Sequence, residues 1–376
     1  DLFKLKKDMH QFVSIQESSG AEVALTHGIY DSAKKAAKFS AFFSLSSSGG
    51  AKWPDHIRWM TVDGVIKKAK KGSKAGAGAG AGALPILPRA DGEIAFLQYT
   101  SGSTSEPKGV MISHANLAHN QVIIAADLRT TVDTVCVSWL PQYHDMGLIG
   151  SYLGTIQCGG RGVFMSSISF LKDPLLWMRT LSQYKGTHTQ APSFAYALVA
   201  RKLQEHARRG GKPLALDLSA TQHMINAAEP VDPQAITDFY AAFGPMGLPA
   251  DVVVPTYGLA EHTVFVCSGG RQMEPFSTSA LANNRAEIVI VSEAKGDATK
   301  DVEATRVLVG CGYPKNAQGV DVRIVEPDTC AALPERSVGE VWVTSPSKAQ
   351  GYWNRPEASQ VFTAKILSQA LSSSSS

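Results

Sequence analysis

The chain has 376 residues, of which 44% are hydrophobic and 18% are charged, the composition of an ordinary globular protein with room for two cores or one large core. Its net charge of +3 argues against a strongly acidic partner, so we expect no nucleic acid to bind. Five cysteines, an odd number without metal-ligand spacing, argue against a disulfide framework and indicate reduced thiols in the cytoplasm.

Low-complexity sequence interrupts the N-terminal quarter. Residues 44–50 and 72–83 have the composition of flexible insertions, and the basic run 67–74 is interpreted as a solvated linker. The start at Asp1 rather than at methionine indicates a fragment or a processed product. Residues 1–8 lack the pattern of a signal peptide, and no apolar run approaches the roughly 20 residues that span a bilayer. We therefore expect a soluble protein without a transmembrane segment.

A loop rich in hydroxyl groups follows a predicted strand over residues 94–99. Residues 98–114 read Gln-Tyr-Thr-Ser-Gly-Ser-Thr-Ser-Glu-Pro-Lys-Gly-Val-Met-Ile-Ser-His. Backbone N–H groups freed by glycine, short hydroxyl donors and a lysine complement a polyphosphate. The spacing differs from that of the P-loop, because Pro107 stands where that motif has its second glycine. A Ser/Thr-rich turn without a ligand is the alternative. The predicted phosphate donors are Thr100, Ser101, Gly102, Ser103, Thr104 and Lys108.

From Glu93 onward, short apolar runs alternate with helical patterns, which predicts an α/β fold with a mainly parallel sheet. Ser113 is expected to cap a helix that runs to Ala125. Asp173 and Asp232 each precede a proline, which predicts that a helix begins at both places. The further predicted strands are 135–140, 162–165 and 251–255, and the further predicted helices are 146–157 and 193–208.

The pattern changes after Gly310. Val320, Val322 and Ile324 alternate with polar positions, a turn follows at residues 327–328, and residues 339–344 form a further predicted strand. This part is expected to be rich in β-structure. The last five residues are serines and are predicted to be disordered.

Four further segments carry polar residues at or near the ends of predicted strands, where parallel sheets gather ligands. They are residues 139–147, 226–230 and 255–261, and the pair 339–342 and 351–353. In this order after the hydroxyl-rich loop, they resemble the motifs of adenylate-forming enzymes, the superfamily of acyl-CoA synthetases, luciferases and peptide-synthetase adenylation domains. The resemblance implies the N-terminal domain of that fold, with stacked parallel-rich sheets, helices and a β-rich subdomain.

The same resemblance implies that a carboxylate is transferred to the α-phosphorus of ATP and that pyrophosphate leaves. Such a site must neutralise phosphate oxygens and hold the anionic nucleophile in line. Glu261 suits Mg²⁺, which binds one or two carboxylates together with phosphate oxygens, and Thr104 is a second candidate ligand. Tyr257 offers an aromatic face for adenine, with a core tyrosine as the alternative. Further nucleotide contacts are implied for Ala228, Glu229, Pro230 and Gly258.

His144 requires separate consideration, because a lone histidine at a turn is more often structural than catalytic. In the superfamily a histidine or aromatic residue at this motif meets the substrate carboxylate, which implies that role for His144. Asp145 is interpreted as a helix N-cap. The catalytic candidates are therefore His144, Glu261 and Lys108.

Several segments are similar to fatty acyl-AMP ligases in particular, the branch that hands activated fatty acids to acyl carrier domains of polyketide and lipopeptide synthases. They are residues 97–99, 139–150, 191–196 and 349–357. That branch carries a late insertion thought to hinder CoA ligation, and the interval from Gly258 to Leu308 is long. The implied substrate is a fatty acid and the implied partner an acyl carrier protein or synthase. The alternatives are a long-chain acyl-CoA synthetase and a catalytically inactive adenylate- or lipid-binding module.

An acyl channel is expected beside the predicted helix over residues 192–198. Gly154, Met165 and Phe194 are the candidates to face it, and Gly258 and His144 complete the predicted substrate contacts. Apolar residues on a helix are also what an ordinary core requires, so packing is the alternative.

The resemblance extends over about residues 21–362 and predicts four parts. They are a partial N-terminal α/β subdomain (1–92), an AMP-binding α/β core (93–310), a β-rich subdomain (311–365) and a disordered tail (366–376). It also implies that both ends of the family pattern are missing, including the ribose-binding aspartate and the mobile C-terminal domain with its lysine. Losing one transition-state donor costs roughly 10²–10³ in rate, so the activity of this chain alone is an open question.

Overall fold

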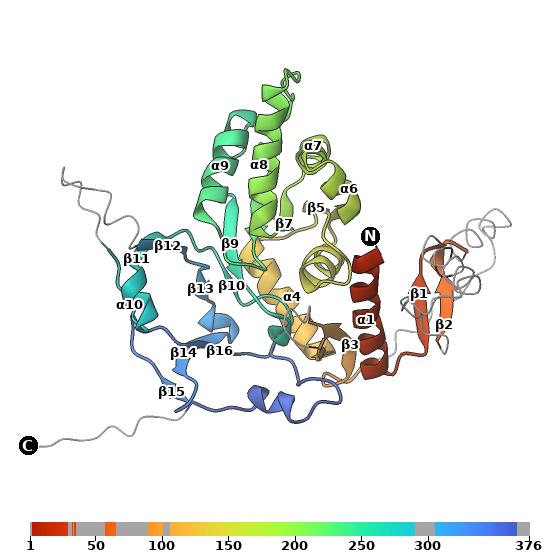
Figure 1. Cartoon of the computed structure of the whole chain (residues 1–376), viewed down its shortest axis with the longest axis vertical. Coiled ribbons are helices and arrows are strands. Elements are labelled where there is room, and N and C mark those ends of the chain that lie inside the picture. Colours follow the sequence, from red (N-terminus) through yellow and green to blue (C-terminus); the bar gives the residue numbers. More distant parts are fainter. Residues whose placement is uncertain are drawn as a thin grey trace, which may run out of the picture.

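The structure is a computed structural model that describes residues 2–28, 32, 34, 57–64, 89–100, 106–289 and 305–366 (Figure 1). The predicted insertions at 44–50 and 72–83, the basic run 67–74, residues 101–105 of the hydroxyl-rich loop and the serine tail lie outside these residues.

A seven-stranded sheet forms the centre of the fold, in the spatial order β13-β10-β9-β8-β7-β5-β6. The strands from β6 to β9 run parallel, whereas β10 and β13 are antiparallel to their neighbours. The prediction of an α/β fold with a mainly parallel sheet is therefore confirmed. The strands are β5 (Val135–Ser138), β6 (Arg161–Phe164), β7 (His188–Ala191), β8 (His223–Asn226), β9 (Val253–Tyr257), β10 (Cys267–Ser268) and β13 (Tyr313–Pro314).

Helices cover both faces of this sheet, as the alternating side chains of β7 demonstrate. His188 bonds to the carbonyl of Leu128 in α4 (His114–Leu128), and Gln190 bonds to Ser151 in η1 (Met146–Leu153). Thr189, which lies between them in sequence, accepts from Trp177 of α7 (Leu175–Tyr184) on the other face. The face of α7 also carries α8 (Ser193–Arg208), which packs against α9 (Pro233–Phe243).

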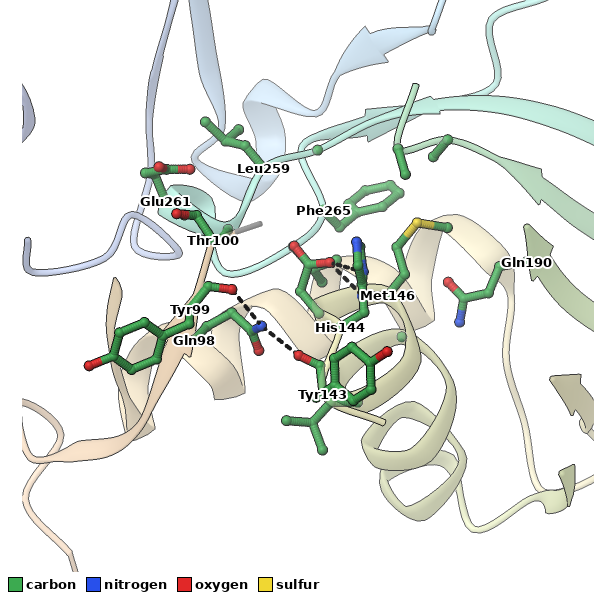
Figure 2. A pocket seen from close by; sticks show the side chains of 18 of the residues that line it. Gln98, Tyr99, Thr100, Tyr143, His144, Met146, Gln190, Leu259, Glu261 and Phe265 are labelled. Carbon is green, nitrogen blue, oxygen red and sulfur yellow. Dashed lines mark hydrogen bonds and ion pairs between the residues drawn. The ribbon is translucent and has the colours of Figure 1, made fainter. Parts of the chain in front are cut away.

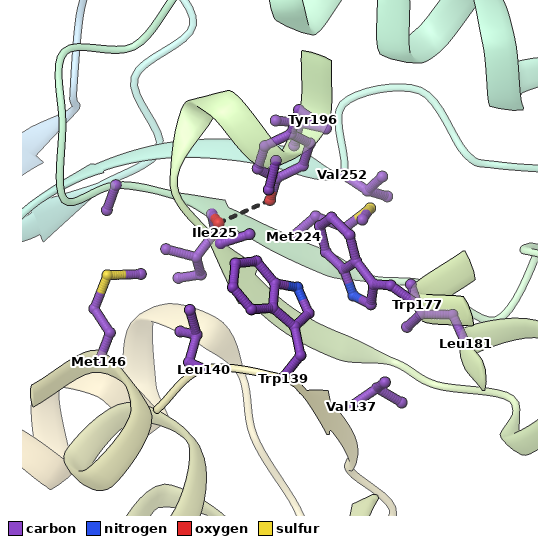
Figure 3. Close-up of a cluster of buried hydrophobic side chains, with 14 of the residues drawn as sticks. Val137, Trp139, Leu140, Met146, Trp177, Leu181, Tyr196, Met224, Ile225 and Val252 are labelled. Atoms are coloured by element: carbon purple, nitrogen blue, oxygen red, sulfur yellow. Dashed lines mark hydrogen bonds between the residues drawn. The ribbon is translucent and has the colours of Figure 1, made fainter. Parts of the chain in front are cut away.

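The main hydrophobic core lies between the sheet and these helices (Figure 3). Trp139 stacks on Phe170 with ring centroids 3.9 Å apart, and Trp177 meets both rings edge-on. Tyr196 of α8 is fully buried, and its hydroxyl donates to the carbonyl of Ile225 over 2.7 Å. This core fixes the carboxyl ends of β5, β7 and β8, where several of the predicted motifs lie.

Smaller sheets surround the central one. They are the hairpin of β3 (Ile94–Tyr99) and β4 (Gly109–Ser113), the pair β1 (Val23–Thr26) and β2 (Arg58–Thr61), the pair β11 (Met273–Ser277) and β12 (Thr305–Val309), and the sheet of β15 (Ala331–Ala332), β14 (Asp321–Glu326) and β16 (Glu340–Thr344). The β-strands expected after Gly310 are confirmed by β14 and β16. The remaining helices are α1 (Leu2–Ser19), α5 (Gly154–Cys158), α6 (Ser167–Lys172), α10 (Thr278–Ala282), η2 (Gly244–Met246), η3 (Ala260–His262), η4 (Asn316–Gln318) and η5 (Ala358–Phe362).

All three predicted helix starts are confirmed, and two of them have a side-chain cap. Ser113 accepts from Asn116 N and forms a capping box at the start of α4, and Asp232 accepts from Gln234 N at the start of α9. Helix α7 also begins where Asp173 and Pro174 predicted it, directly after Pro174, but the Asp173 carboxylate does not cap it. The Asp173 carboxylate pairs instead with Arg179, the fifth of the ten residues of α7.

We expect Asp232→Ala to lower the free energy of unfolding by about 1 kcal/mol, because it removes an N-cap bond. Asp173→Ala removes only a partly exposed ion pair, which contributes about 0–1 kcal/mol. Urea unfolding of both variants measures the difference, and an equal or larger loss for Asp173→Ala would contradict the assignment of caps.

The helix predicted over residues 146–157 is present, but its first part is a π-helix. In η1 the chain makes wider turns, and the N–H of Gly154 donates to Ile149, five residues back. A Cβ on Gly147 would lie 2.0 Å from the Pro141 carbonyl oxygen, so only glycine permits this close approach. Helix α5 then continues to Cys158. Single π-turns occur frequently at functional sites, and η1 borders the cavity described next.

Candidate functional site

A cavity of about 810 Å³ lies at the carboxyl ends of the parallel strands (Figure 2). Residues from β7, β8 and β9 line it together with α4, the start of η1, the strand β3 and the segment that leads into η3. Glu261 and Thr100 lie at one end in Figure 2, Gln190 lies at the other, and His144 and Met146 lie between them. The cavity is therefore placed where open parallel sheets bind ligands.

The hydroxyl-rich loop is closed at its base by two reciprocal hydrogen bonds. Thr100 N donates to the Lys108 carbonyl over 3.0 Å, and Lys108 N donates to Thr100 Oγ1 over 3.2 Å. Thr100 lines the cavity. The predicted phosphate donors Ser101, Gly102, Ser103 and Thr104 lie outside the described residues.

Lys108, Tyr352 and Glu261 form one cluster beside this loop. The Lys108 ammonium lies 4.9 Å from the centre of the Tyr352 ring, an arrangement that favours the cation. The Tyr352 hydroxyl donates to Glu261 Oε1 over 2.7 Å. Burial and the neighbouring Glu261 carboxylate raise the pKa of Tyr352, so its hydroxyl keeps its proton as a donor. One Glu261 oxygen is thus held in place, and Glu261 lines the cavity.

The backbone around Tyr352 connects the loop that carries Lys108 to the segment that carries Glu261. Trp353 N donates to Gly109, and Met111 N donates to Gly351, so the segment lies along β4 at the base of the loop. Ala349 N donates to the Glu261 carbonyl. The sequence motif at residues 351–353 carried no assigned role, and the structure gives it one, because it connects the loop strand to η3.

His144 is paired with Asp145 beside the cavity. His144 Nδ1 lies 2.6 Å from Asp145 Oδ1, and the His144 side chain is 47% exposed whereas that of Asp145 is 13% exposed. The hydrogen bond to Asp145 raises the pKa of His144 above its usual range. Asp145 Oδ1 also accepts from Met146 N, which confirms Asp145 as the cap of η1. The pair favours an imidazolium in the cavity, which suits an anionic ligand group.

Asp145→Asn should lower the pKa of His144, because asparagine can still accept from Met146 N but carries no charge. Because the folded-state pKa is raised, the pair stabilises the fold fully below the ordinary histidine pKa of about 6.5 and ceases to do so as pH rises through the folded value. The stability gap between wild type and variant should therefore close on the alkaline side.

Histidine NMR titration measures this shift. His223 serves as the internal control, because burial lowers its pKa to about 4 through contacts that do not include Asp145. An unchanged His144 pKa in Asp145→Asn would show that the carboxylate does not control the imidazole.

Some of the remaining residues predicted to contact the nucleotide line the cavity, and others lie outside it. Ala228, with a φ of 72°, and Gly258 both line the cavity. Glu229 is exposed and accepts from Phe194 N over 2.6 Å, at the start of α8, next to the exposed Pro230. Tyr257 is half-buried and packs against the main core. Glu229, Pro230 and Tyr257 are not among the residues that line the cavity.

The three predicted acyl-channel residues, Gly154, Met165 and Phe194, are not among those that line the large cavity, and Met165 packs against the main core. Gly154 borders a smaller cavity behind it, next to Gln121. Phe194 is 47% exposed and meets Trp139 edge-on at 6.3 Å.

Two glutamines that the sequence patterns did not identify border the cavity. Gln98 Nε2 donates to the Tyr143 carbonyl over 2.9 Å and so connects β3 to the turn before η1 (Figure 2). Gln190 is buried within β7, in a strand whose residues are all buried. A glutamine inside a short buried strand requires a hydrogen-bond partner, but the polar sequence His-Thr-Gln-Ala did not predict a buried strand here.

The described residues contain no group of three or more His, Cys, Asp or Glu side chains that could bind a metal ion by themselves. A single carboxylate such as that of Glu261 is sufficient for an ion that takes most of its ligands from phosphate oxygens and water. Within the same ranges of the chain, no helix is both long and apolar enough to cross a membrane.

Residues 10–353 match the family described as AMP-binding enzyme. The chain is 39% identical over 266 residues to the medium-chain-fatty-acid–[acyl-carrier-protein] ligase JamA of Moorena producens, covering 70% of this chain and 43% of that protein. It is 34% identical over 374 residues to the corresponding ligase TtuA of Teredinibacter turnerae, covering 93% of this chain and 55% of that protein. It thus spans about half the length of these relatives.

The fold is also similar to that of a crystal structure, the fatty acyl-adenylate ligase of L. pneumophila in complex with acyl adenylate and pyrophosphate. The TM-score is 0.72 at 30% sequence identity, over 94% of this chain and 55% of that one. The fold expected from the sequence resemblance is therefore confirmed.

Proposed function

Since the chain belongs to the AMP-binding enzyme family, we propose that it is the nucleotide- and acyl-binding part of a fatty acyl-AMP ligase, which converts a fatty acid and ATP to an acyl-adenylate and pyrophosphate. One observation carries the proposal. A single cavity extends from the base of the hydroxyl-rich loop and Glu261, past His144, to an end with apolar residues. This is the order in which an acyl-adenylate presents phosphate, carbonyl and alkyl chain.

Each group has a role that follows from its position. Lys108 and the hydroxyl-rich loop would neutralise the β- and γ-phosphates of ATP, and Glu261 would bind Mg²⁺, which supplies positive charge to the phosphates when bound. The His144 imidazolium would hold the fatty acid carboxylate for in-line attack on the α-phosphorus. The alkyl chain would lie against apolar side chains that border the cavity, among them Ile124, Leu128, Ile225 and Phe265.

The partner is proposed to be an acyl carrier protein or synthase. The names of the two ligases similar to this chain support an acyl-carrier acceptor. We also propose the four-part division at residues 92, 310 and 365, and a cytoplasmic location, which the five free cysteines support.

Pyrophosphate release from a panel of fatty acids and ATP tests the reaction in the full gene product that contains this chain. Mass spectrometry should detect the acyl-adenylate. Adding an acyl carrier protein or CoA in parallel identifies the acceptor, and abundant acyl-CoA would overturn the carrier assignment. ATP binding without pyrophosphate release for any fatty acid would overturn the enzymatic proposal in favour of a binding module.

A further inference from the structure

Gln190 lies at the end of the cavity opposite Glu261 (Figure 2). Gln190 Nε2 donates to Ser151 Oγ over 2.7 Å, so the amide crosses from β7 to η1. Gly150, on the same turn of η1, leaves room for it. A Cβ at Gly150 would lie 2.6 Å from Gln190 Oε1. The amide therefore fills the gap between strand and helix.

A second, smaller cavity of about 30 Å³ lies behind this amide. It shares Gln190, Gly150 and Ile225 with the large cavity and continues toward the amino ends of β7 and β8, where His188 and His223 lie. The two cavities are thus consecutive spaces along one face of the sheet. Only the side chains at their common boundary separate them.

Apolar side chains from α4 and β8, those of Ile124, Leu128 and Ile225, border both spaces. The small one is also bordered by both histidines, by Thr155 and by Gln121. His188 and Thr155 have hydrogen bonds to the carbonyls of Leu128 and Ser151, and an alkyl chain in the small space would leave these bonds intact. The barrier between the two spaces is therefore formed by the Gln190 side chain and its neighbours at the common boundary.

We infer that Gln190 is the residue that limits the length of the acyl chain, because its amide forms the end wall of the apolar part of the cavity. This inference rests on the proposed function and names the determinant of its substrate range. The terminal methyl group of the fatty acid lies against Gln190 when the substrate has the preferred length. Longer fatty acids must displace the Gln190 side chain, which occupies the volume at this end.

Gln190→Ala joins the two cavities and should shift the preference of pyrophosphate release toward longer saturated fatty acids. Each added methylene that becomes buried should raise the kcat/KM ratio of long to short substrates by roughly fourfold. Gln190→Met fills a similar volume without the amide and is the matched control, so it should retain the wild-type length limit. Gly154→Leu in the Gln190→Ala background should refill the small cavity and return the profile toward wild type.

An unchanged length profile in soluble Gln190→Ala would overturn the inference. If that variant does not fold, Gln190→Asn keeps an amide but shortens it by one methylene. The preferred length should then increase by about one methylene, and an unchanged optimum would equally overturn the inference. The wild type separates the two proposals. If the wild type releases pyrophosphate and the Gln190 variants have the same fatty acid length profile, the proposed reaction stands and only the role of Gln190 is wrong. If it releases none, the reaction is wrong, and calorimetric binding of the same fatty acids tests the wall.

Discussion

Glu261→Gln should slow pyrophosphate release by roughly 10²–10³-fold, the usual consequence of removing one preorganised electrostatic group from a site of developing charge. The replacement keeps the shape of the side chain. Its amide oxygen can still accept from the Tyr352 hydroxyl, which in the wild type lies 2.7 Å from Glu261 Oε1, so only the negative charge is lost. Calorimetry of ATP binding at several Mg²⁺ concentrations should show a weaker dependence on the ion.

Glu205→Gln is the matched control for this prediction. Glu205 lies near the end of α8, where it pairs with Lys202 on the helix surface, and it does not line the cavity. The same chemical change there should leave pyrophosphate release within about twofold, since exposed surface ion pairs contribute little. Equal rates for Glu261→Gln and wild type would remove Glu261 from the mechanism.

A Tyr352 variant separates the effect of the position of the Glu261 carboxylate from the effect of its charge. Tyr352→Phe retains the ring beneath the Lys108 ammonium but removes the donor to Glu261. Because Glu261 is the proposed Mg²⁺ ligand, losing the partner that orients it should cost about 10–100-fold in affinity or activity, which is less than the effect expected for Glu261→Gln. A smaller loss of activity in Tyr352→Phe than in Glu261→Gln is therefore expected if Tyr352 acts by orienting Glu261.

Local patterns predicted the parts of the fold that depend on nearby residues. The strand Ile94–Tyr99 and the helix Ser193–Arg208 have the predicted bounds. Caps were predictable where the partner is two or three residues away, as at Ser113 and Asp232. At Asp173 the same pattern failed, because the guanidinium of Arg179 competes for the carboxylate. The sequence shows both candidate partners but not which one is bound.

The site was predictable to the extent that motifs follow strand ends. The turn residues His144 and Gly258 and the η3 residue Glu261 border one cavity, as the ends of parallel strands require. The partners of these residues come from distant segments, such as Tyr352, which is 91 positions from Glu261. Glu229 illustrates the same limit, because its contact with Phe194 depends on how β8 meets α8. Such pairings depend on tertiary packing and leave no local pattern.

Gly258→Ala should cost about 3 kcal/mol of unfolding free energy, at or above the upper end for overpacking. A Cβ at this position would lie 1.8 Å from the Val264 carbonyl oxygen. That turn cannot move aside easily, since the buried side chain of Asn120 donates to the Phe265 carbonyl over 2.9 Å and accepts from Phe265 N over 3.2 Å. The clash therefore either destabilises the fold or displaces the segment that carries Glu261 into the cavity.

Gly244→Ala provides the comparison, because a Cβ there meets no atom within 4 Å outside its chain neighbours and the residue has helical angles of −53° and −45° at the end of α9. Replacing glycine by alanine at helical angles stabilises by about 0.4–1 kcal/mol, but Pro245 disfavours helical angles at the residue before it, so we expect a small net change. Urea unfolding of the two variants then separates the steric effect from the general effect of replacing glycine. A loss for Gly258→Ala no larger than that for Gly244→Ala would mean that the turn at Val264 adapts, and that the position of Glu261 does not depend on the glycine before it.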